Sequence, residues 1–100
     1  MHEPTSRPMD ARVKKAVLGK IDETVSNIDE ISKIMQSFAH IPVGNQEDFA
    51  FGIAIGRIYN SFHYQTRRAL KRNATQDEFA EFLRILTSKA DKIRTALTQL

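Results

Sequence analysis

The sequence predicts a single all-α domain built as an antiparallel three-helix bundle, and three observations support this prediction. Apolar residues recur at three- and four-residue spacing along three long stretches, which is the period of an α-helix. The three prolines stand at positions 4, 8 and 42, so no proline interrupts the chain from position 43 onward. The connections between the periodic stretches are short, as they are between neighbouring helices of a bundle.

The first predicted helix follows a short N-terminal tail. Residues 1–9 contain two prolines and little that is apolar, so we expect a flexible tail there and a single helical domain over residues 10–100. Asp10 can cap the helix that follows it. The periodicity extends this helix over residues 12–39, and the proline and glycine within residues 40–44 then end it.

The second and third predicted helices each begin at a capping signal. Asn45 is a good N-cap for a middle helix over residues 46–72. Residues 59–66 are poor in strong helix formers, and a break there would give four helices instead of three. Thr75 and Glu78 have the spacing of a capping box, which opens the last helix.

Length and composition exclude several classes of protein. The chain has 100 residues, the length of one domain, and no cysteine. Disulfide bonds and thiolate metal sites are therefore excluded, and a reducing cytosol is the simplest setting, so we expect a cytoplasmic protein. The three histidines do not stand at metal-ligand spacing and no cofactor motif is present, so we expect neither a metal nor a cofactor. The longest apolar stretch, residues 49–55, is too short to span a bilayer, and we expect no membrane partner.

The basic residues are concentrated in one segment. The formal net charge is +3, but no acidic residue occurs between Phe49 and Gln76. That segment carries five cations, and the rest of the chain has a formal charge of −2. Such a concentration of positive charge indicates an anionic partner. The five cations are Arg57, Arg67, Arg68, Lys71 and Arg72.

One face of the predicted middle helix combines four of these cations with other polar groups. At about 100° per residue, the members of this face fall within roughly one-third of the helix circumference. Arginine pairs with phosphate oxygens, asparagine and serine add hydrogen bonds, and an exposed tyrosine offers a ring for stacking on a base. We therefore expect a small binding module, not an enzyme, that contacts RNA or DNA through this face. The alternatives are a contact with an acidic protein and a solvated face whose cations complement the helix dipole. The face consists of Arg57, Asn60, Ser61, Tyr64, Arg67, Arg68 and Lys71.

A second hypothesis rests on Arg57 and on His63, which follows it six residues later. This spacing resembles the Arg-x(4–6)-His signature of HEPN domains, which are all-helical modules that are frequently metal-independent ribonucleases acting as dimers. The resemblance implies that Arg57 and His63 line a dimer cleft where RNA is cleaved, with Asn60 as a polar helper. The sequence departs from the pattern at Ile58, where the family usually has a polar residue, and the chain is shorter than most members. The alternative is a structural His63 at the border between the apolar and basic faces.

The first half of the middle helix is apolar nearly all round. Gly52 and Gly56 are four residues apart, which leaves one side of the helix smooth enough for another backbone to approach closely. Phe49 and Ile53 lie beside this smooth side. Either the other two helices cover these four residues within the chain, or a second subunit does. The first account is the simpler one, and the second makes the four residues the contact of a homodimer.

Overall fold

The computed structural model describes residues 9–99, and 79% of these residues are helical, with no strand among them. The predicted all-α class is confirmed. The predicted count of three helices is corrected to five, because the first and third predicted helices are each divided in two, whereas the middle helix is continuous. The helices are α1 (Ala11–Ser26), α2 (Ile28–Ser37), α3 (Gln46–Leu70), α4 (Gln76–Ser88) and α5 (Ala90–Leu97).

Both unpredicted breaks follow hydroxyl side chains that bond to the helix backbone. Before the break at Asn27, the Thr24 hydroxyl donates to a carbonyl one turn back at 2.7 Å. Before the break at Lys89, the hydroxyls of Thr87 and Ser88 donate to preceding carbonyls at 2.8 and 2.6 Å. Such bonds compete with the backbone ladder and bend helices. The asparagine and the lysine that follow then leave helical geometry for one residue each.

The long helix α3 has a well-defined start and end. The Asn45 side chain accepts a hydrogen bond from the backbone N–H of Asp48 at 2.8 Å, which confirms the predicted N-cap. At the other end, Lys71 takes the left-handed conformation, with φ 61° and ψ 30°, and its N–H donates to the Arg67 carbonyl at 2.9 Å. At 25 residues, α3 spans roughly 37 Å, most of the length of the molecule.

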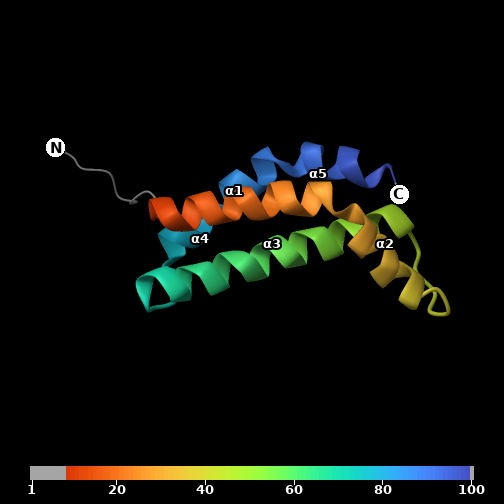
Figure 1. The fold of residues 1–100 in the computed structure, drawn as a ribbon, viewed down its shortest axis with the longest axis horizontal. Coiled ribbons are helices and arrows are strands. Elements are labelled where there is room, and N and C mark those ends of the chain that lie inside the picture. The colour runs from red at the N-terminus through yellow and green to blue at the C-terminus, as the bar shows by residue number, and fades with distance from the viewer. Residues whose placement is uncertain (1–8, 100) are drawn as a thin grey trace.

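Figure 1 shows how the other helices are arranged around α3. α1 runs antiparallel beside it, and α5 packs against both α1 and α3. The start of α1, the end of α3 and the start of α4 lie at one end of the molecule, whereas α2 diverges from the direction of α1 at the opposite end, beside the start of α3. None of the helices in the described part of the chain has the length and apolar content needed to cross a membrane.

The core follows the contact between α1 and α3. Of the tail predicted over residues 1–9, Met9 is buried, and residues 1–8 lie outside the described part of the chain. In the first half of α3 the fully buried positions are Ala50 and Ala54, whereas Phe51 and Ile55, which the helical periodicity assigns to the buried stripe, are only half-buried. The buried apolar side chains are those of Met9, Val13, Val17, Ile21, Ile31, Ala50, Ala54, Ile58, Phe62, Phe82, Leu86, Ile93 and Leu97.

Candidate functional site

The exposed side of α3 is a row of residues spaced four apart, which we call the exposed row. The buried positions of α3 are also spaced four apart, and each member of the exposed row comes two residues after one of them. Two residues turn an α-helix by about 200°, so the exposed row stays opposite the core along the whole helix. The exposed row consists of Gly52, Gly56, Asn60, Tyr64 and Arg68, and every member is exposed.

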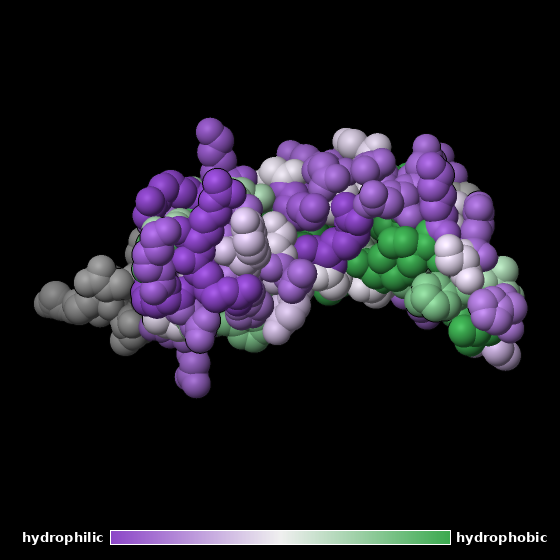
Figure 2. All heavy atoms as spheres, turned by 60° about the horizontal axis from the view of Figure 1, so that its bottom comes forward, coloured by the Kyte–Doolittle hydropathy of each residue, from purple (hydrophilic) through white to green (hydrophobic). Residues whose placement is uncertain are grey.

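Three cations gather where the exposed row ends, and we call them the cationic end: Arg67, Arg68 and Lys71. All three are exposed, and none forms an ion pair with a carboxylate among residues 9–99. Figure 2 shows hydrophilic side chains gathered at this end of the molecule. Tyr64, with 52% of its surface exposed, and Asn60 lie one and two turns before the cationic end on the same side of the helix. The structure therefore brings together five of the seven residues predicted for the basic face.

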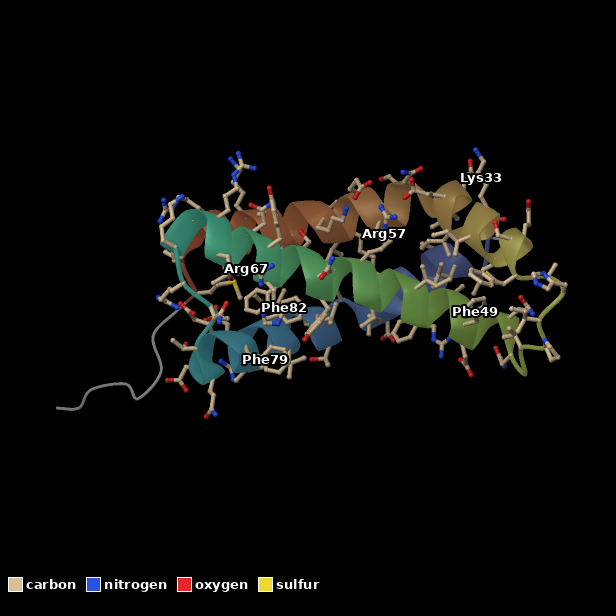
Figure 3. All side chains as sticks on the ribbon, turned by 90° about the horizontal axis from the view of Figure 1, so that it is seen from below. Lys33, Phe49, Arg57, Arg67, Phe79 and Phe82 are labelled. Carbon is tan, nitrogen blue, oxygen red and sulfur yellow. The ribbon has the colours of Figure 1, made fainter. Side chains whose placement is uncertain are left out.

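Arg57 does not belong to this open surface. It forms ion pairs with Glu23 of α1, at 3.5 Å, and with Glu30 of α2. Figure 3 shows the Arg57 side chain between α3 and α1. Only 24% of this side chain is exposed, and its Nε atom is buried without a hydrogen-bond partner. Arg57 thus joins three helices across the break at Asn27. Ser61, one turn further along the same side of α3, is half-buried.

His63 lies on the other side of α3, in an aromatic cluster with α4. Its ring is 4.7 Å from that of Tyr59, 4.9 Å from that of Phe62 and 6.0 Å from that of Phe79. Arg57 contacts α1 and α2, whereas His63 contacts α4, so the two side chains point to different flanks of α3. Within one chain they do not converge on a common substrate position, which the resemblance to HEPN ribonucleases would require of a shared site.

An apolar groove lies between the first half of α3 and the wall formed by α2 and the connection that follows it. Its volume is about 360 Å³. The Phe38 and Phe49 rings meet edge to face, with centroids 6.5 Å apart. Phe38 and Ile41 are 44% and 47% exposed, and Figure 2 shows a hydrophobic patch toward this end of the molecule. The groove was not predicted, because its α2 wall comes from residues that the helical period assigns to the core or to a loop. It is lined by Ile34, Phe38, Ile41, Val43, Phe49 and Ile53.

The two glycines of the exposed row are open to their surroundings. A Cβ atom added to Gly52 or Gly56 would meet no atom within 4 Å apart from the neighbouring helix backbone. No other helix in residues 9–99 therefore uses the missing side chains for a close approach. Of the four residues predicted as an oligomer contact, Phe49 and Ile53 line the apolar groove, and the two glycines lie on the exposed row beside it.

Arg72 lies next to the cationic end but is engaged within the chain. Its guanidinium donates two hydrogen bonds to the Glu78 carboxylate, at 2.8 and 2.9 Å, and Glu78 completes the predicted capping box with Thr75. The Arg72 guanidinium lowers the pKa of the Glu78 carboxyl to about 2, against the opposing effect of burial. At the start of α1, the Arg12 side chain likewise lowers the pKa of Asp10 to about 2.

Within residues 9–99 no cluster of three or more His, Asp or Glu side chains is placed to hold a metal ion. Comparison of the chain with protein-family models, with curated proteins and with solved structures finds no match. The chemistry of the surface itself is therefore the basis for a functional proposal.

Proposed function

We propose that the protein binds single-stranded RNA or DNA through the second half of α3. The observation that carries the proposal is the cationic end, where three exposed cations lie within five residues and have no ion-pair partner among residues 9–99. Arginine and lysine side chains neutralise and hydrogen-bond to the phosphates of a nucleic-acid backbone. The proposed contact residues are Asn60, Tyr64, Arg67, Arg68 and Lys71.

Several other cations of residues 9–99 have partners, unlike the cationic end, although Lys14, Lys15, Lys33, Arg84 and Lys89 also form no ion pair there. Arg57, Arg72 and Arg94, among others, each form an ion pair with a carboxylate. A helix dipole alone favours cations in the last turn of α3, and it accounts for part of this charge. It does not account for an exposed tyrosine and an asparagine on the same side of the helix. A base can stack on the Tyr64 ring while the backbone follows the cations, which favours a single strand over a duplex.

A salt titration tests the proposal. Binding of a fluorescent random-sequence single strand should weaken as salt rises, with a log–log slope of about −0.7 for each phosphate contact, so three cations give a slope of about −2. The double substitution Arg67→Glu/Arg68→Glu should abolish binding and leave the circular-dichroism spectrum unchanged, because both side chains are exposed. Tyr64→Ala should weaken binding by about 1–3 kcal/mol if a base stacks on the ring.

Arg57 provides a matched control, because it is a cation on the same helix that is held by two carboxylates. Arg57→Ala should change the dissociation constant by less than about twofold, since no phosphate contact is lost. Absence of binding at low salt, or an equal loss in Arg57→Ala and Arg67→Ala, would refute the proposal. If the double reversal instead disrupts a complex with an acidic protein while oligonucleotides never bind, the partner of this surface is that protein.

A further inference from the structure

Two rows of side chains on α3 end in the cationic end. One is the exposed row, in which Tyr64 comes four residues before Arg68. The other runs through Tyr59, His63 and Arg67, and each of these residues follows a fully buried residue by one position. One residue turns an α-helix by about 100°, so the second row stays at about this angle from the core along the helix.

Helix α4 adds Phe79 to the second row, and we call Tyr59, His63, Phe79 and Arg67 the aromatic flank. The Tyr59 ring is 45% exposed and stands at 76° to the rings of both His63 and Phe79. The latter two rings are half-buried and only 28° from parallel. Figure 3 shows the Arg67 side chain on the side of α3 toward α4. The flank therefore joins an aromatic surface to one cation of the cationic end.

The polar atoms of the aromatic rings have no partner in the described part of the chain. Neither the Tyr59 hydroxyl nor a ring nitrogen of His63 forms a hydrogen bond among residues 9–99. The buried side-chain atoms without a partner belong to Arg57 and Arg94, so both nitrogens of His63 reach the surface. A nucleobase has flat faces that stack on aromatic rings and polar edges that form hydrogen bonds, and the flank presents a group for each.

The charge at the aromatic flank is positive. The second half of α3 carries no acidic residue. On α4, Asp77 and Glu81 are each two residues from Phe79, which places them about 200° around the helix from it. Glu81 also accepts a hydrogen bond at 2.6 Å from the backbone just before α1, and Glu78 is held by an arginine. The flank thus suits a ligand that is both aromatic and anionic.

We propose that a base of the bound strand stacks on the aromatic flank, where Tyr59 is the exposed ring, His63 offers a polar edge and Arg67 holds the adjoining backbone. The inference rests on the nucleic-acid function proposed above and adds a second base-binding position to that of Tyr64. The two tyrosines lie about 140° apart around α3, so a strand that reaches both must curve around the helix. A single strand can follow this path, whereas a duplex is too stiff to bend over so short a length.

Tyrosine fluorescence tests the inference directly, because the chain has two tyrosines and no tryptophan. In Tyr64→Phe the only tyrosine is Tyr59, and a base that stacks on its ring should quench its emission. Titration with a random-sequence single strand should lower this emission in step with binding, which a label on the strand measures separately. A strand of equal length built of abasic units should bind through the cationic end and leave the emission unchanged.

Affinities measured over a range of salt separate stacking from charge. Tyr59→Ala should weaken binding by about 5- to 150-fold, the loss of one stacked base, and Tyr59→Phe, which keeps the ring, should restore the affinity. The log–log salt slope of Tyr59→Ala should equal that of the unmodified chain, whereas Arg67→Ala should make the slope shallower by about 0.7, because the slope counts phosphate contacts. Phe38→Ala is the matched control, since Phe38 is 44% exposed at the other end of the molecule, and its affinity should not change.

The outcomes distinguish the inference from the proposed function. Constant Tyr59 emission while the strand binds, equal quenching by the abasic strand, or full affinity in a folded Tyr59→Ala would overturn the inference and leave the nucleic-acid function standing. An acidic peptide that quenches Tyr59 when the strand does not would make the flank a protein contact, which also overturns it. A strand that fails to bind the unmodified chain at low salt contradicts both. Circular dichroism verifies that each variant is folded.

Discussion

In the first half of α3 the core is filled by alanine, at positions 50 and 54, whereas in the second half it is filled by Ile58, Phe62 and Thr66. The large apolar side chains of the first half, such as Phe49 and Ile53, lie instead on its flank and are only half-buried. The second half buries its large residues and exposes cations. The first half buries only alanines, so its large apolar side chains remain partly exposed on the surface. The second half buries its large apolar side chains, so its surface positions are occupied by polar and charged residues.

The largest change in stability is expected from a substitution in the core of the second half of α3. The Phe62 and Phe82 rings stack at 4.4 Å and both are fully buried, so Phe62→Ala should lower the free energy of unfolding by about 3–5 kcal/mol. Ala54→Gly, at an equally buried position of the first half, removes one carbon and should lower it by about 1 kcal/mol. Urea denaturation measures both values. Equal losses would mean that the two halves do not differ in how the core is filled.

A smaller effect is expected at the end of the second half when the pH falls. The pKa of Glu78 is lowered from 4.5 to about 2 by Arg72, so its contribution to stability is complete above about pH 4.5 and disappears as the pH falls toward 2. This contribution should be about 1.5–3 kcal/mol, the usual range for hydrogen bonds to a charged group. Urea denaturation at several pH values measures the decline, and Glu78→Gln should flatten it.

Hydrogen exchange locates the same acid effect along the chain. Protection should decrease first at residues 71–78 and not at the start of α3, where Asn45 caps the helix with a neutral side chain. Asp10 has a similarly lowered pKa, so Asp10→Asn is the control for acid effects at the start of α1. If the free energy of unfolding of Glu78→Gln falls as steeply with pH as that of the unmodified chain, other carboxylates cause the acid sensitivity.

The smallest effect concerns the exposed row of the first half. Gly52→Ala and Gly56→Ala should each raise the free energy of unfolding of the monomer by about 1 kcal/mol, because the added Cβ meets no atom within 4 Å. Thermal denaturation at low protein concentration measures this gain. Destabilisation by either alanine would show that the space beside these glycines is filled by another part of the chain.

Features that depend on neighbouring residues were predictable from the sequence. The caps at Asp10, Asn45 and Thr75 are as predicted, because each rests on a side chain and an amide two or three residues away. The breaks at Asn27 and Lys89 were missed, since the hydrophobic period continues across both. Their signal is the threonine or serine shortly before each break, which is weaker than a proline or a glycine.

Features that depend on distant partners were not predictable in the same way. Arg57 lies 27 residues after Glu30 in the sequence, and only the packing of α2 on α3 makes them neighbours. The apolar groove has the same origin, because one wall comes from α3 and the other from α2 and the connection after it. The orientation of Gly52 and Gly56 could have been inferred from the four-residue spacing of the buried alanines, which places both glycines on the opposite side of α3.

Lys71, at the end of α3, has a backbone conformation that is unusual for a residue other than glycine. Its left-handed backbone is the conformation in which glycine is most readily accommodated, and a residue with a Cβ atom is less stable there by about 1–2 kcal/mol. Glycine would therefore give the more stable fold at position 71, but the residue present is lysine. A chain selected for stability alone would end this helix with glycine and lose one of the three charges of the cationic end. Lys71 therefore lowers the stability of the fold and adds a positive charge at the point where α3 meets solvent.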